Sequence, residues 1–96
     1  MAELRFEWDP RKASANLAKH GVSFEEAQTA FSDEGALLLD DPESANEDRF
    51  VLLGLSAKLR VLVVVHCYRG EDAVIRLISA RKADRLERQQ YVTRNS

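Results

Sequence analysis

Three polar side chains on one short helix are the first candidates for chemistry in this sequence. Lys12, Asn16 and His20 lie four residues apart in WDPRKASANLAKHG, so they share one face of the helix that this stretch predicts. A histidine can act as a general acid or base near neutral pH, and a nearby lysine can stabilise negative charge. His20 also stands directly before Gly21, where a histidine favours the end of a helix without any catalytic role. Both interpretations of His20 stay open at this point.

Arginines in the predicted strands form a second set of candidates. Strict alternation places Arg76 in an otherwise uncharged strip of its strand: Val74, Ile78 and Ala80. Arg49 and Arg60 begin comparable strips in two other strands. A guanidinium on a concave sheet face can hold a phosphate through two parallel hydrogen bonds. Internal ion pairs with Glu47 or Glu87 are the competing, structural interpretation of the same spacing.

The composition restricts the class of protein. The 96 residues are 45% hydrophobic and 31% charged, so we expect one globular domain over residues 1–96. The longest uncharged apolar run, Val61 to Val65, is far shorter than a membrane span, and the charged N-terminus is unlike a signal peptide. We therefore expect a cytoplasmic protein that makes no membrane contact.

The residue types that bind metals and cofactors are scarce. Two histidines and the single Cys67 give no zinc pattern, and no glycine-rich phosphate loop is present, so we expect no metal and no cofactor. Ser79 has no evident base beside it in the sequence and is more consistent with a structural role.

Charge is distributed unevenly, although the formal net charge is only -2. Seven acidic residues and no basic residue occur between Asp33 and Asp48, whereas six bases and two acids occur between Arg76 and Arg94. The basic segment can create a positive field that attracts a polyanion, or it can simply be a solvated helix face.

The hydrophobic pattern predicts helices first and strands afterwards. Asp9 caps a helix over residues 10–20 with Ala13 and Leu17 toward the core, and a capping box, Ser23–Glu26, begins a second helix that ends near residue 31. The period then changes to 2 and predicts strands over residues 36–39, 49–55, 60–68 and 73–81, with a further short strand conceivable at 5–8. A last helix runs from residue 82 to about 92 with Leu86 on its inner side.

These elements predict an α+β domain. It consists of an N-terminal helix pair, an antiparallel meander of about four strands and a C-terminal helix, with the helices on one face of the sheet.

Several of these blocks together resemble one known family. FEWDPRKASANLAKHGVSFEEAQTAF, EDR at 47–49 and IRLISARKADRLERQQY are similar to the motifs of BrnT, the toxin of a bacterial type II toxin–antitoxin pair, over roughly residues 6–91. The resemblance implies a single toxin domain with a RelE-like fold, and a metal-independent ribonuclease that inhibits translation. It also implies neutralisation by the DNA-binding antitoxin BrnA, and repression of their own operon by the complex, with operator DNA contacted only through the antitoxin.

The resemblance implies catalytic residues as well. In RelE-like enzymes the protein aligns a ribose 2′-hydroxyl for attack on the adjacent phosphate, and basic residues stabilise the charge that develops. Arg49, Arg76 and Arg81 are expected to be the phosphate or transition-state ligands. Lys12 would supply a further cation, and His20 would be the general acid or base.

Four further residues occupy motif positions or lie beside them. Glu47 would be a catalytic base, or would orient an arginine by ion pairing, and the same two roles are open for Glu87. Arg85, Glu87 and Tyr91 are expected to lie at the RNA, which is either free or bound to the ribosome. Tyr91 would stack on a base or belong to the core.

A non-catalytic binding module is the alternative function. Such a protein would act mainly as an antitoxin ligand and corepressor, which the mildly acidic net charge favours. A small-ligand domain that uses the concave side of the sheet is a third hypothesis, but no feature of the sequence favours it.

Overall fold

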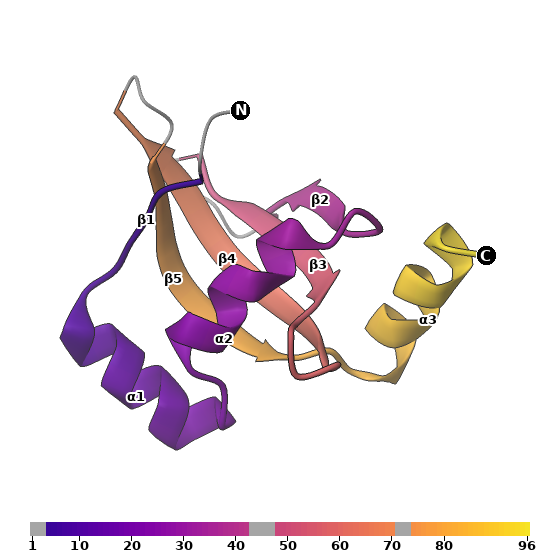
Figure 1. The fold of residues 1–96 in the computed structure, drawn as a ribbon, viewed down its shortest axis with the longest axis horizontal. Helices are drawn as coiled ribbons and strands as arrows, with labels where there is room; N and C mark the ends of the chain where they lie inside the picture. Colours follow the sequence, from indigo (N-terminus) through magenta and orange to yellow (C-terminus); the bar gives the residue numbers. More distant parts are fainter. Residues whose placement is uncertain (1–3, 43–47, 71–73) are drawn as a thin grey trace.

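The chain forms one mixed sheet with helices on both faces in a computed structural model that describes residues 4–42, 48–70 and 74–96 (Figure 1). The strand order is β1-β5-β4-β3-β2. Four strands form the antiparallel meander that the alternating pattern predicts: β2 (Leu37–Asp40), β3 (Phe50–Leu55), β4 (Val61–Arg69) and β5 (Val74–Lys82). No described helix is long and apolar enough to cross a membrane.

The prediction of a purely antiparallel, four-stranded sheet is wrong in one detail. β1 (Phe6–Glu7) adds a fifth strand, and it pairs in parallel with β5. Short loops exclude parallel pairing only between strands that follow each other in the chain, and β1 is separated from β5 by most of the domain. The RelE-like outline implied by the family resemblance differs from the observed fold in this respect.

The first two helices lie where their capping residues predict them. α1 (Pro10–His20) begins after Asp9, whose side chain accepts the Arg11 N–H at 2.9 Å, and it ends at Gly21 with a left-handed φ of 69°. α2 (Phe24–Thr29) begins after Ser23, which accepts the Glu26 N–H at 3.0 Å, and continues into the 3-10 turn η1 (Ala30–Ser32). These ends are confirmed because capping is decided by residues only two or three positions apart.

The last helix covers the opposite face of the sheet from the first two. One core cluster joins α1 and α2 to Leu52, Leu62 and Leu77, and we call this side the α1/α2 face. A second cluster on the other side contains Leu53 and Val63, together with Tyr91 of α3 (Arg85–Arg94), and we call it the α3 face. The prediction that all helices lie on one face is therefore wrong (Figure 1).

Two leucines that the helical pattern placed toward the core are in fact exposed. Leu17 on α1 is 51% exposed and Leu86 on α3 is 71% exposed, whereas Ala13 packs against the core as expected. α3 begins at Arg85 rather than at residue 82, because the Asp84 side chain caps it. Tyr91, and not Leu86, packs against the sheet.

A bulge interrupts the alternation of β5. His66 of β4 pairs with Leu77, but the preceding Val65 pairs with Ser79, so Ile78 has no cross-strand partner. An extra residue of this kind reverses the facing of every side chain beyond it.

The bulge decides which arginines share a face. Strict alternation predicted Arg76 beside Ile78 and Ala80, and therefore opposite Arg81. In the structure Ala80 is buried in the α1/α2 core, and Arg76, Ser79 and Arg81 all lie on the α3 face. The predicted strip is therefore wrong beyond the bulge. It had placed Arg76 and Arg81 on opposite faces of the sheet, whereas they share one face.

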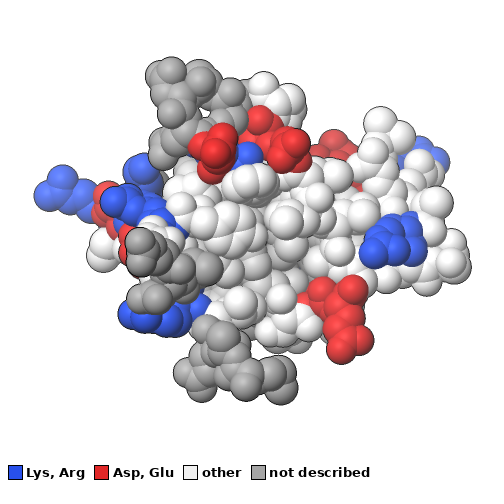
Figure 2. Space-filling model, turned by 90° about the horizontal axis from the view of Figure 1, so that it is seen from above, with Lys and Arg blue, Asp and Glu red and all other residues white. Residues whose placement is uncertain are grey.

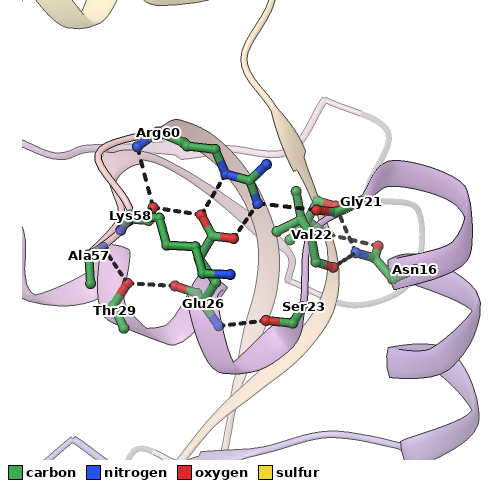
Figure 3. Close-up of polar contacts among 11 residues, drawn as sticks. Asn16, Gly21, Val22, Ser23, Glu26, Thr29, Ala57, Lys58 and Arg60 are labelled. Carbon is green, nitrogen blue, oxygen red and sulfur yellow. Dashed lines mark hydrogen bonds and ion pairs between the residues drawn. The ribbon is translucent and has the colours of Figure 1, made fainter.

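Arg60 lies on the α1/α2 face, where it forms part of a structural cluster rather than joining the other arginines (Figure 3). Its Nε donates to Glu26 Oε2 at 2.9 Å and its Nη2 pairs with the other carboxylate oxygen, while Ser56 donates to Glu26 at 2.7 Å. Glu26 is only 4% exposed, and its hydrogen bond with Arg60 lowers the pKa of its carboxyl. The cluster fastens α2 to the turn between β3 and β4.

His66 is fully buried in an aromatic cluster on the α1/α2 face. Its ring centroid lies 4.8 Å from that of Phe31 and 5.4 Å from that of Tyr68. Nδ1 lies 3.1 Å from the Val64 carbonyl, and Nε2 has no hydrogen-bond partner among the described residues. Burial lowers the pKa of His66, so the folded protein holds this ring neutral.

We expect acid to destabilise the protein through His66. Its pKa is lower in the folded state than in the unfolded state, so the unfolded chain binds the proton first and the free energy of unfolding falls as the pH drops below about 6.5. Urea unfolding at about pH 7.5 and about pH 5.5 measures this fall, above the range in which carboxylates such as Glu26 become protonated. His66→Phe should flatten the dependence. An equal slope in His66→Phe would contradict the prediction.

Candidate functional site

A groove of about 560 Å³ crosses the α3 face of the sheet, and we call it the sheet groove. Its floor is apolar and consists of strand residues: Leu39, Val51, Val63 and Val65. At the β5 end it is lined by His20, Ser79, Arg81 and Glu87, and at the β2 end by Asp40, Asp41 and Pro42. A flat apolar floor with a cation and a histidine at one end suits a ligand that combines a ring system with an anion.

Arg81 is held in a fixed orientation by Glu87. Its two terminal nitrogens donate to the two carboxylate oxygens of Glu87 at 2.7 and 2.8 Å. The same carboxylate accepts the Asp84 N–H at 2.8 Å in the capping box of α3, so it is anchored from two sides. The hydrogen bond with Arg81 lowers the pKa of Glu87, and the same contact raises the pKa of Arg81. Of the two roles expected for Glu87, this geometry supports the orienting role.

Arg76 lies on the same face but outside the residues that line the sheet groove. Its side chain is 28% exposed, and Nη1 donates to Glu7 Oε2 at 2.6 Å. Glu7 is the cross-strand neighbour of Arg76 in the parallel pair, so this ion-pair partner comes from β1, whereas Glu87 binds Arg81. Arg76 and Arg81 are separated by about 15 Å along the strand, so Arg76 lies well away from the end of the groove that Arg81 lines.

Arg49 directly precedes β3, one residue before Phe50. Its carbonyl accepts the Asp41 N–H at 3.1 Å, which continues the pairing of β2 and β3 beyond the ends of both strands. Alternation from Val51, which lines the sheet groove, places Arg49 on the α3 face as the sequence predicts.

The polar stripe of α1 divides into three residues with different surroundings. His20 ends α1 as the sequence predicts, and from this last position it also lines the sheet groove; its role as a general acid or base stays a prediction. Asn16 is buried and hydrogen-bonded to β5. Lys12 is exposed about 12 Å before His20 along the helix axis, and it is not among the described residues that line the groove.

The side-chain amide of Asn16 makes the hydrogen bonds to β5 that a neighbouring strand would otherwise make. Its Oδ1 accepts the Ala80 N–H at 3.0 Å, and its Nδ2 donates to the Ala80 carbonyl at 2.8 Å and to the Val22 carbonyl at 2.9 Å. The amide therefore satisfies the free edge of β5 where the pairing with β1 has ended. This contact brings the end of α1, and with it His20, to the edge of the groove.

Two further predicted residues, Tyr91 and Arg85, lie outside the groove lining. The Tyr91 hydroxyl donates to Asp33 at 2.6 Å, which raises the pKa of Tyr91 to about 12, and its ring packs against the second core cluster. Arg85 is exposed and lines a separate hollow on the far side of α3. Glu47 falls outside the described residues. The assignment of these three residues to RNA or catalysis stays a prediction.

Sequence reasoning missed the place of Ser79 in the groove. Ser79 faces the groove next to Arg81 only because the bulge at Ile78 reverses its facing. No local sequence signal marks that bulge. Among the described residues, no three histidine, cysteine, aspartate or glutamate side chains come together in a metal-binding arrangement.

The fold is similar to that of a known class of bacterial toxin. The structure is similar to the 1.1 Å crystal structure of the Brucella abortus ribonuclease toxin BrnT, with a TM-score of 0.63 and 25% sequence identity, over 86% of this chain and 100% of that chain. Residues 8–87 match the family described as the ribonuclease toxin BrnT of type II toxin–antitoxin systems. None of the curated proteins compared with the chain matches it significantly.

The chain belongs to the BrnT family of type II toxins. This confirms the resemblance that the sequence motifs indicated. A toxin of this type has an antitoxin as its partner.

Proposed function

We propose that this chain is an endoribonuclease toxin that cleaves RNA in the sheet groove without a metal ion. The observation that carries the proposal is the position of Arg81, which the bulge turns onto the groove face and Glu87 holds by both carboxylate oxygens. Its guanidinium is thereby presented at the same end of the groove as His20 and Ser79. This is the arrangement that stabilises charge on a phosphate that is being attacked.

The reaction can be assigned to these residues step by step. The ribose 2′-hydroxyl attacks the adjacent phosphorus, the bond to the 5′-oxygen of the next nucleotide breaks, and the products carry a 2′,3′-cyclic phosphate and a 5′-hydroxyl. The 2′-hydroxyl loses a proton and the leaving 5′-oxygen gains one: His20 carries out one of these two transfers, water carries out the other, and Arg81 stabilises the negative charge that builds up on the phosphate. Ser79 is placed to hydrogen-bond a phosphate or ribose oxygen, and the apolar floor supports a base.

The other arginines of the α3 face extend the site. We assign Arg76 and Arg49 to phosphates that flank the cleaved bond, because they lie on the groove face but farther along the strands. Lys12 is too far along α1 to act on the same phosphate as His20, so any contact that it makes is to a more distant part of the RNA.

Regulation follows from membership in a type II system. We infer that the antitoxin neutralises the toxin by preventing access of RNA to the groove, and that the complex represses its own operon through DNA contacts made by the antitoxin. The target RNA, free or bound to the ribosome, places the action of the toxin in the cytoplasm.

Replacement of His20 tests the proposed reaction directly. We expect the purified wild-type chain to cleave RNA in excess EDTA and to leave 2′,3′-cyclic phosphate ends, whereas His20→Gln should cleave about 100-fold more slowly. Lys19→Gln, one position earlier on the exposed side of α1, is the matched control and should keep full activity. Product ends are identified by mass spectrometry, and the rates by single-turnover cleavage.

Two results would contradict this proposal in different ways. Loss of cleavage in EDTA would contradict metal independence alone. No cleavage by the wild type under any condition, together with tight binding to the antitoxin, would favour the non-catalytic binding module.

A further inference from the structure

A second groove lies between α3 and the edge strand β2, and we call it the edge groove. It measures about 610 Å³ and is lined by Leu37 and Leu39 of β2 and by Leu86, Gln90 and Arg94 of α3, with Gln89 and Thr93 beside them. Leu39 is 45% exposed and Leu86 is 71% exposed. Because Leu39 lines the sheet groove as well, the two grooves adjoin.

The rim of the edge groove offers unpaired backbone groups. β2 is the last strand of the sheet on that side, so its outer edge pairs with no strand among the described residues. The Asp41 N–H donates inward to Arg49, and alternation therefore turns the backbone groups of Leu38 and Asp40 outward. Such an edge can accept a further strand from another chain.

One basic side chain, Arg94, lines the α3 wall of the edge groove. Arg85 and Arg88 are also exposed on this helix but line a separate hollow, and two acidic residues of the same region are engaged: Asp84 caps the helix and Glu87 binds Arg81. Figure 2 shows basic side chains on the right, where α3 lies in Figure 1, with acidic side chains close to them. An apolar floor, one arginine on the α3 wall and a free strand edge are complementary to an extended protein segment that alternates apolar and acidic residues.

We propose that the edge groove binds an extended, acidic segment of the antitoxin, which adds as a strand to β2 and places apolar side chains between Leu39 and Leu86. The segment would cover Leu39 and so narrow the adjoining sheet groove. Binding of the antitoxin at the edge groove would thereby inhibit RNA cleavage in the sheet groove. This inference rests on the proposed function only for that inhibitory consequence. RNA fits the edge groove less well, because none of the described residues lining it is aromatic and could stack on a base. RNA also has no peptide backbone that could pair with the edge of β2.

Two substitutions on α3 test the docking surface. The cognate antitoxin is titrated against the toxin, in a His20→Gln background that allows expression, and the dissociation constants are measured by calorimetry. Leu86→Asp and Arg94→Glu should each weaken binding about tenfold or more, because they place negative charge where the acidic segment docks. Leu59→Asp is the matched control, since Leu59 is 79% exposed in the turn between β3 and β4 and its φ of 62° is one that aspartate adopts readily.

The strand addition has a separate readout. Amide exchange should show that the outward N–H groups of Leu38 and Asp40 become protected in the complex, and Leu38→Pro, which removes one of them at an edge position, should weaken binding. RNA cleavage by Leu86→Asp and Arg94→Glu, tested in the otherwise wild-type chain, should stay at the wild-type rate.

The outcomes separate this proposal from the proposed function. Wild-type antitoxin affinity in both α3 variants would overturn the docking site. Loss of RNA binding with unchanged antitoxin affinity would also overturn it, and would assign the edge groove to RNA. If the wild type cleaves no RNA while both variants still lose antitoxin affinity, the docking site stands and the ribonuclease proposal fails.

Discussion

Arg81→Lys is expected to slow RNA cleavage about 100-fold without unfolding the protein. Lysine keeps the positive charge but loses the planar fork that binds Glu87 on one side and can bind a phosphate with its remaining N–H groups. The Arg81 side chain is 43% exposed, so its ion pair contributes little to the free energy of unfolding and the effect should be confined to the reaction. Single-turnover cleavage, together with thermal unfolding, measures both quantities.

One further variant and one control show whether the orientation of Arg81 matters in addition to its charge. Glu87→Gln keeps a hydrogen bond to Arg81 but removes the carboxylate, and we expect a smaller loss of rate with the same products. Arg11→Lys on the exposed surface of α1 is the matched control and should cleave at the wild-type rate. If Arg81→Lys is as active as the wild type, Arg81 supplies only charge, and the planar geometry of its guanidinium does not contribute to the reaction.

The parts of this fold that sequence predicts are those decided by neighbouring residues. Asp9, Gly21 and Ser23 set helix ends through contacts that span two to four positions, and each was found where the pattern placed it. The antiparallel order of β2 to β5 follows in the same way from short loops. The family motifs likewise led to the family that the comparisons establish.

The parts that sequence did not predict depend on contacts between distant residues. The bulge at Ile78 is a property of how β5 fits β4, and alternation alone placed Arg76 and Arg81 on opposite faces. The parallel pairing of β1 and the crossing of α3 to the other face also join segments far apart in the chain. As a result, the sequence identified His20 and Arg81 as candidate residues, but it did not predict that both would line the same groove.

Asn16 illustrates how a correct pattern led to an incomplete interpretation. The spacing of four placed it on one helix face with Lys12 and His20, and this is the observed arrangement of α1. Spacing says nothing of what packs against that face, and the amide is occupied by β5. Asn16 was expected to be part of a functional surface, but its hydrogen bonds to β5 instead hold the end of α1, and with it His20, beside the groove.

Asn16→Leu is expected to lower the free energy of unfolding by about 3 kcal/mol or more. Leucine is close to asparagine in size but satisfies neither the N–H and carbonyl of Ala80 nor the carbonyl of Val22, and each buried backbone group left without a partner costs about 1–3 kcal/mol. A domain of this size has a total stability of roughly 0.05–0.15 kcal/mol per residue, so the loss is a large part of it. Urea unfolding measures the difference, and faster exchange of the Ala80 amide proton locates it.

Asn16→Leu should also separate the structural role of this residue from catalysis. Lys12→Ala, one turn earlier on the same face, should leave both stability and Ala80 exchange unchanged because Lys12 is exposed. At a temperature where Asn16→Leu is still folded, its cleavage rate should fall as well, because α1 no longer holds His20 at the edge of the groove. Full activity in the folded variant would mean that His20 reaches the groove without the Asn16 anchor, and its position would then have to be attributed to the turn at Gly21 instead.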